Sequence, residues 1–155
     1  MKNAFILIFP LLVFLTACGE DDETTTPEVE PDENQISFSK SNGADPTLEA
    51  NQDRITDNVW ITRGNNGGQI FNIKINSTFS KSESPEDTEW AIGTVDNKDN
   101  LTFQPFRAAV GEPKDVVGKD LVMHLITDDI YLNVRFSSWT QAQGGGFAYV
   151  RDIVE

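Results

Sequence analysis

The sequence predicts an all-β fold for the segment from about residue 34 to residue 152, and three features indicate it. Apolar and polar residues alternate with a period of two in short runs, as in strands with one buried face. Gly, Asn, Asp and Pro cluster between these runs, where turns are expected. No stretch keeps the 3.6-residue apolar period of a long helix.

Two sheets packed face to face are the simplest arrangement that buries one apolar face of each sheet. We therefore predict an antiparallel β-sandwich, of the size of a jelly roll or an immunoglobulin-like domain. A closed β-barrel is the alternative. The segment of about 120 residues is large enough to bury one substantial core.

Most strands are predicted from local apolar alternation. We expect strands at residues 36–40, 89–94, 101–103 and 147–151. Residues 105–110 begin with a proline and predict a short helical turn.

Residues 57–75 predict a hairpin. Its loop, residues 64–68, reads Gly-Asn-Asn-Gly-Gly, which tolerates positive φ. We place Arg63 opposite Gln69, which assigns the remaining residues to two faces. The apolar face then holds Val59, Ile61, Phe71 and Ile73, and the polar face holds Asn58, Trp60, Thr62, Ile70, Asn72 and Lys74.

The strongest local pattern is a second hairpin across residues 121–136. Asp128-Asp129 is taken as a two-residue turn, so that Leu125 faces Leu132. One face is then apolar at every pair, and this is what sets strand register. The other face pairs Ile126 with Tyr131, His124 with Asn133 and Val122 with Arg135.

The N-terminal segment has the pattern of a secretory signal. Lys2 gives a positive start, residues 4–15 are almost wholly apolar, and small residues precede Cys18. The run is shorter than the ~20 residues of a membrane-spanning helix. Leu15, Ala17 and Cys18 resemble the lipobox of bacterial lipoproteins, which implies cleavage before Cys18, a diacylglyceryl thioether on its sulfur and acylation of its amine. An ordinary signal peptide cut at another site is the alternative.

After residues 1–17 are removed, residues 18–35 are predicted to be a lipidated cysteine and a disordered acidic tether. Residues 19–33 contain eight acidic side chains and no basic one, so they bury too little apolar surface to fold. Residues 20–23 resemble the export tag of Bacteroidetes-type surface lipoproteins. This implies the outer face of the outer membrane, and a spacer at its periplasmic face is the alternative. Residues 36–155 are the single β domain.

Composition excludes several classes of protein. The net charge of −13 excludes nucleic-acid binding through a basic surface. One cysteine excludes a disulfide framework and a thiolate zinc cluster.

A further set of residues spans most of the domain from Arg54 onward. It comprises residues 56–60, 88–91, 101–103, 128–131, 136–139 and 144–147, with His124, Tyr149 and Arg151. Together these residues resemble a module of uncharacterised secreted and anchored bacterial proteins. The resemblance implies a secreted β module and transfers no catalytic or binding residue.

Residues suited to catalysis or metal binding form no recognised motif. The chain lacks a Gly-x-Ser-x-Gly turn, and the glycines at 144–146 lack the Lys-Ser/Thr of a phosphate loop. His124 lies within a strand, where a hydrogen bond across the sheet is expected. Residues 96–100 offer oxygen ligands for Ca²⁺ without the spacing of an EF-hand. No pair stands out among the carboxylates considered for glycoside hydrolysis, which are Asp57, Glu89, Asp128 and Asp129.

Aromatic rings flanked by amides give the candidate binding residues, because planar rings stack on sugars while amides bind sugar hydroxyls. The candidates are Trp60, Asn58 and Asn72 on one hairpin, and Tyr131, Asn133 and Arg135 on the other. The alternative is that a neighbouring strand or loop covers Trp60.

These features predict a cell-envelope lipoprotein whose domain is a non-catalytic binding or accessory module for a glycan or a protein partner. Its second partner is the membrane, through the lipid on Cys18. We predict no catalytic residue, metal, cofactor or nucleic-acid partner. A small secreted hydrolase that uses carboxylates or Ca²⁺, and a structural component of envelope assembly, are the alternatives.

Overall fold

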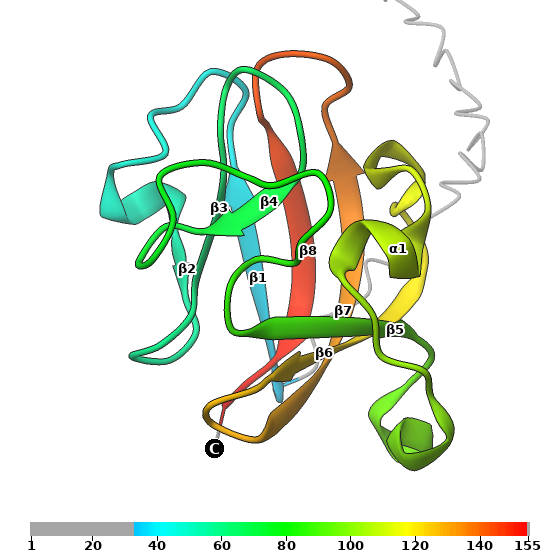
Figure 1. The fold of residues 1–155 in the computed structure, drawn as a ribbon. Coiled ribbons are helices and arrows are strands. Elements are labelled where there is room, and N and C mark those ends of the chain that lie inside the picture. The colour runs from blue at the N-terminus through cyan, green and yellow to red at the C-terminus, as the bar shows by residue number, and fades with distance from the viewer. Residues whose placement is uncertain (1–32, 155) are drawn as a thin grey trace, which may run out of the picture. The chain divides into compact units, whose positions relative to one another are not determined.

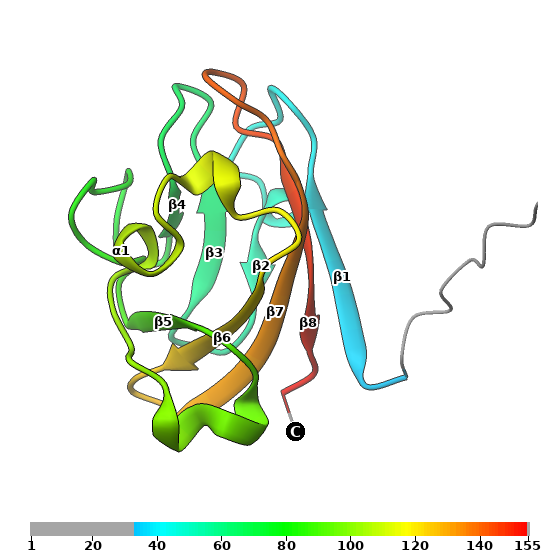
Figure 2. The ribbon, with the colours of Figure 1, turned by 90° about the vertical axis from the view of Figure 1, so that its right-hand side faces the viewer.

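The computed structural model describes residues 33–154, which form eight strands in two antiparallel sheets. The larger sheet has the order β1-β8-β7-β6-β5, and the smaller has the order β2-β3-β4. Figures 1 and 2 show the two sheets as facing layers. The strands are β1 (Gln35–Lys40), β2 (Asp53–Arg54), β3 (Trp60–Arg63), β4 (Ile70–Asn72), β5 (Thr88–Ile92), β6 (Asp120–Leu125), β7 (Ile130–Trp139) and β8 (Phe147–Asp152).

Neither sheet closes on itself within residues 33–154, because each ends in two different edge strands. The predicted antiparallel β-sandwich is confirmed, and the closed barrel is not formed. The helical elements are short: η1 (Glu49–Asn51), η2 (Val95–Asn100), α1 (Phe106–Val110) and η3 (Pro113–Asp115). In this part of the chain no helix is long and apolar enough to cross a membrane. The predicted signal peptide, Cys18 and the tether up to residue 32 lie outside the described residues.

The hydrophobic core fills the space between the two sheets. Alternate residues of β6 and β7 point inward, including Met123 and Phe136, and Ile61 comes from the small sheet. Three strands cannot cover five, and α1 covers part of the remaining inner face from the same side as the small sheet (Figure 2). Phe106 of α1 packs edge-on against Trp90 of β5, with ring centroids 5.0 Å apart.

A buried ion pair joins the two sheets. Arg151 of β8 donates from Nε and Nη2 to the carboxylate of Asp53 in β2, at 2.7 and 2.8 Å. The Tyr149 hydroxyl donates to the same carboxylate at 2.6 Å. Burial raises the pKa of Tyr149 well above its ordinary value, and the charge of Asp53 raises it further. Burial alone would lower the pKa of Arg151, but the hydrogen bonds and charge of Asp53 outweigh burial and raise it.

The predicted register of the β6–β7 hairpin is wrong by two residues. Leu125 pairs with Ile130 and His124 with Tyr131, so the loop is residues 126–129 rather than Asp128-Asp129 alone. The wider loop is held by distant contacts, since the Asp128 carboxylate accepts hydrogen bonds from Thr56 Oγ1 and Asn58 Nδ2. A two-residue slip leaves each side chain on its predicted face.

The predicted register of the β3–β4 hairpin is wrong by one residue. Arg63 pairs with Ile70, not with Gln69, and Ile61 therefore pairs with Asn72. Gln69 stays in the loop because its amide nitrogen donates to Glu83 O at 2.7 Å and also to Ser80 O. A one-residue slip exchanges the two faces of one strand, so Ile70 and Asn72 are both fully buried.

The remaining local predictions differ in outcome. The strands expected at 36–40, 89–94 and 147–151 correspond to β1, β5 and β8, and the helical turn at 105–110 corresponds to α1. Residues 101–103 form no strand, and the neighbouring Gln104 makes an isolated bridge to Trp90. Strand β2 is too short to leave a pattern in the sequence.

Candidate functional site

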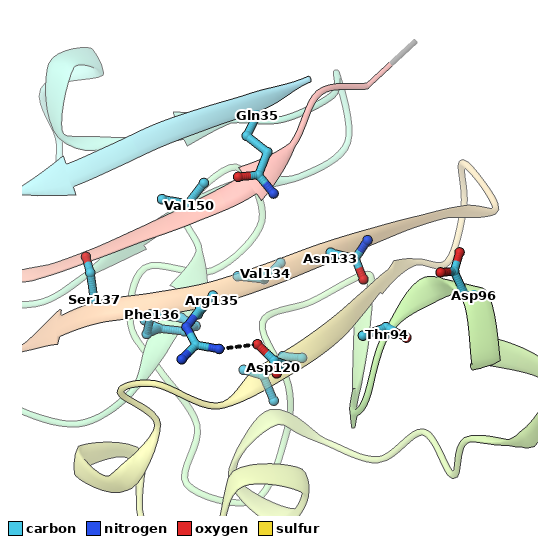
Figure 3. A pocket seen from close by; sticks show the side chains of 11 residues that line it. Gln35, Thr94, Asp96, Asp120, Asn133, Val134, Arg135, Phe136, Ser137 and Val150 are labelled. Carbon is cyan, nitrogen blue, oxygen red and sulfur yellow. Dashed lines mark hydrogen bonds and ion pairs between the residues drawn. The ribbon is translucent and has the colours of Figure 1, made fainter. Parts of the chain in front are cut away.

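A groove of about 400 Å³ lies on the outer face of the large sheet, away from the core. Strands β1, β6, β7 and β8 form its floor, and the chain around the start of η2 forms one wall (Figure 3). Figure 3 draws side chains of both faces of the sheet: Val134 and Phe136 are buried, and those that point outward are mostly polar. The outward-facing residues are Gln35, Thr94, Asp96, Asp120, Asn133, Arg135, Ser137 and Val150.

Asn133 fixes the wall of the groove. Its Oδ1 accepts a hydrogen bond from the backbone N–H of Val95, the first residue of η2, at 2.8 Å. Its backbone N–H and its Nδ2 both donate to Asp152 Oδ2 of the neighbouring strand β8, each at 2.8 Å. Asn133 therefore positions η2 against β7, and its amide is already engaged by protein groups.

An ion pair lies on the floor of the groove. Arg135 of β7 and Asp120 of β6 are directly opposite in the ladder, and Arg135 Nη1 donates to Asp120 Oδ1. Both side chains are more than half exposed, at 59% and 61%. The pair thus offers guanidinium donors and a carboxylate acceptor side by side to a ligand.

A β-bulge shapes the next part of the floor. The pairing of β7 with β8 shifts between Phe136 and Ser138, and Ser137 is the extra residue. The extra residue allows both Phe136 and Trp139 to pack their rings together, with centroids 5.8 Å apart, although they are three positions apart. A bulge re-aims the side chains beside it, and here the exposed Ser137 lines the groove.

Trp60 and its predicted neighbours lie on the small sheet, apart from this groove. The Trp60 Nε1 donates to Thr56 O at 3.1 Å, and its ring centroid is 4.2 Å from Arg54 Cζ and 4.8 Å from Lys74 Nζ. Asn72 is fully buried and donates to Asn58 O and Glu86 O, and Asn58 donates to Asp128. These amides hold loops together, and the predicted shared polar face of Trp60 and Asn72 is wrong.

Tyr131 belongs to a separate cluster around His124. The Tyr131 ring stacks on the imidazole with centroids 4.0 Å apart and an interplanar angle of 3°. His124 lies between two carboxylates, with Nδ1 2.7 Å from Glu89 Oε1 and Nε2 3.1 Å from Asp129 Oδ1. Phe103 packs on both rings in a T-shaped arrangement, with interplanar angles of 67° to His124 and 70° to Tyr131. The predicted hydrogen bonding of His124 across the sheet is confirmed, but its partners are carboxylates rather than Asn133.

Three of the four carboxylates considered for catalysis are engaged by other side chains. Glu89 and Asp129 bind His124, and Asp128 binds the Thr56 and Asn58 side chains. Residues 96–100, considered for Ca²⁺, lie within η2, where Lys98 pairs with Asp99 at 2.9 Å. Among residues 33–154, no three His, Cys, Asp or Glu side chains are arranged to hold a metal ion.

Sequence reasoning found Arg135 and Asn133 but missed Gln35, Asp120 and Ser137 as groove residues. A usable signal existed for Asp120, because opposite charges at facing positions of an antiparallel pair favour a register. The assumed two-residue turn instead paired Arg135 with Val122. No signal identified Gln35, because β1 and β7 lie far apart in sequence and are separated in the sheet by β8.

Comparisons of the chain with protein-family models, curated proteins and solved structures found no match.

Proposed function

We propose that the protein is a non-catalytic binding module of the cell envelope and that the outer groove binds a glycan. The observation that carries this proposal is the chemistry of the groove. Arg135 supplies donors, Asp120 supplies acceptors, and Gln35 and Ser137 can do both. Sugar hydroxyls need this mixture of donors and acceptors. The volume of about 400 Å³ is within the range of ~300–1,000 Å³ usual for small-molecule sites.

A glycan is favoured over a protein partner because no large apolar side chain is exposed in the groove: Leu121, Val134 and Phe136 line it, but all three are buried. Protein interfaces centre on buried aromatic or aliphatic side chains. None of the large apolar residues that are exposed in the described part of the chain lines the groove. These residues are Ile36, Leu48, Ile75, Ile92, Val117, Ile126 and Ile153.

A glycan array probed with the full chain tests the groove. We expect binding that Arg135→Ala weakens at least about tenfold, since it removes charge-assisted hydrogen bonds. Arg54→Ala is the matched control, because Arg54 is also an exposed arginine paired with a carboxylate, Glu49 at 3.0 Å, but lies on the small sheet. Equal losses in both variants would place the glycan elsewhere. Absence of any glycan hit, together with capture of a protein by the groove, would contradict the proposal.

The membrane attachment is also proposed, on the lipobox-like residues Leu15, Ala17 and Cys18. Several long acyl chains anchor a protein firmly, because each buried methylene contributes ~0.8 kcal/mol. The acidic residues 20–23 favour the cell surface over the periplasmic face. Metabolic labelling with a radioactive fatty acid should mark the wild-type protein and not Cys18→Ser. A wild-type protein that carries no radioactive fatty acid would contradict the proposed lipid anchor.

A further inference from the structure

A buried arginine at one end of the sandwich has no carboxylate partner. Arg63 is 2% exposed, and its Nε donates to Gly68 O at 2.9 Å. Its Nη1 donates to Thr140 O and Gly146 O at 2.9 and 3.1 Å. Trp139 packs on the guanidinium, with Cζ 4.0 Å from the ring centroid. Burial lowers the pKa of Arg63 to about 10, which reflects a charge that lacks full compensation.

A second buried cation increases the positive potential at this place. Lys40 is 2% exposed and donates to Asn65 Oδ1 at 2.8 Å. Within residues 33–154 neither Lys40 nor Arg63 has a carboxylate at ion-pair distance, although the whole chain carries a net charge of −13. Burial lowers the pKa of Lys40, the positive charge of Arg63 lowers it further, and the negative charge of Asp45 offsets only part of this decrease.

One nitrogen of Arg63 is left to bind a ligand. Among the described residues Nη2 donates to no protein group, since the bonds of Arg63 are made by Nε and Nη1. Fully buried side-chain atoms without a partner are limited, in this part of the chain, to Gln69 Oε1 and Asp87 Oδ2. Nη2 therefore retains contact with solvent, and Arg63 lines a cavity of about 220 Å³.

The other cations that line this cavity already have carboxylate partners. Arg107 makes two hydrogen bonds to Glu112, at 2.8 and 2.7 Å, and Lys114 pairs with Asp115 at 2.9 Å. Lys114 is half exposed, so it is free to turn toward an added anion. Gln141 lines the same cavity and supplies an exposed amide.

We propose that this cavity, which Arg63, Trp139, Lys114 and Gln141 line, binds the carboxylate of an acidic sugar. Glu112 also lines the cavity, but its charge is paired with Arg107. A carboxylate would give Arg63 the counter-charge that the described residues do not, and charge-assisted hydrogen bonds are the strong ones. The cavity is smaller than the ~300–1,000 Å³ usual for a whole ligand, so it fits one charged end group. The choice of a sugar rests on the proposed function, whereas the choice of a carboxylate rests on Arg63 alone.

Titration of the full chain with glucuronate, followed by nuclear magnetic resonance, tests the site. We expect shifts of the Trp139 indole N–H and of the Arg63 Nε–H, which is held by Gly68 O. Glucose, which has no carboxylate, should leave both signals in place. Equal responses to glucose and glucuronate would show that the cavity does not select a carboxylate. A stronger response to N-acetylglycine than to glucuronate would show that the carboxylate ligand is not a sugar.

Lys114→Gln should weaken glucuronate binding about threefold or more, because it removes one nearby charge and leaves Arg63 in place. Lys98→Gln is the matched control, since Lys98 also pairs with the following aspartate at 2.9 Å and is similarly exposed, but lies in η2. If Lys114→Gln and Lys98→Gln bind glucuronate with equal affinity, glucuronate does not bind in the cavity beside Arg63. The Arg63 Nε–H and the Trp139 indole report on this cavity, whereas the backbone amides of Asp120 and Ser137 report on the groove, so failure of the groove and failure of this cavity are distinguishable.

Discussion

At the scale of single residues, the inter-sheet contact of Asp53 with Arg151 and Tyr149 is the feature with the clearest energetic consequence. All three side chains are buried, and the carboxylate accepts three hydrogen bonds. Loss of one partner from a buried ion pair typically costs ~3–5 kcal/mol, because the other charge stays buried without compensation. The contact therefore fixes how β2 sits on β8.

The hydrogen bond from Tyr149 to Asp53 should make the stability of the wild-type protein depend on pH in a way that Tyr149→Phe does not. At neutral pH the variant loses a hydrogen bond to a charged acceptor, worth ~1.5–3 kcal/mol. Above pH 10.0, the ordinary value, the unfolded wild-type chain releases the Tyr149 proton while the folded protein keeps it. The unfolded state then binds fewer protons, so wild-type stability falls as pH rises, and Tyr149→Phe lacks this loss.

Urea unfolding of both proteins between pH 7 and pH 11 measures the effect. The stability difference between wild type and variant should shrink above pH 10.0. Tyr131, the second tyrosine, is common to both proteins and cancels in the difference. A difference that stays constant over this range would show that Tyr149 does not keep its proton in the folded state.

At the scale of elements, the segment between β7 and β8 has glycines where a positive φ and a close neighbour both disfavour a side chain. Gly145 has φ +69°, and a Cβ there would collide with the carbonyl oxygen of Gly64 in the β3–β4 loop. Gly118 has a similar φ of +80° and open space around it. Gly118→Ala should cost ~1–2 kcal/mol from the backbone conformation alone. Gly145→Ala should cost clearly more, because backbone atoms cannot move aside as a side chain can.

The urea midpoints of the two glycine variants measure their losses of stability. The difference between the two losses is the cost of the collision at Gly145, because both variants share the cost of a positive φ. Equal losses of stability would mean that the two loops do not pack as closely as described. Loss of the Arg63 contacts should accompany the Gly145 change, since Arg63 binds Thr140 O and Gly146 O in the same segment.

Sequence patterns located most elements but not their registers. Alternation of apolar and polar residues identified β1, β5 and β8, and in β8 buried and half-buried side chains alternate in the same way. The β6–β7 loop is fixed by Asp128 contacts with Thr56 and Asn58, about seventy positions away, and no local rule contains that information. The same limit applies to the groove, because its floor joins strands from both ends of the chain. Arg135 was found because it faces outward from a strongly patterned strand, and Gln35 was missed because nothing near it in sequence marks a site.

At the scale of the whole domain, the large sheet has two different faces. Its inner face packs on the small sheet and α1, and no other element of residues 33–154 covers its outer face over β7, β8 and β1, where the groove lies (Figures 2 and 3). The candidate aromatic rings are elsewhere: Trp60 contacts Arg54 and Lys74, and Tyr131 stacks on His124. We therefore expect ligand recognition through polar side chains on the sheet rather than through stacking on an exposed tryptophan.

Mapping a bound glycan by backbone amide chemical shifts tests this claim most directly. With the glycan that binds best on the array, we predict the largest shifts at Asp120, Arg135 and Ser137 and unchanged signals of Trp60 and its neighbours. Shifts centred on Trp60, or spread evenly over both sheets, would contradict a binding site in the outer groove.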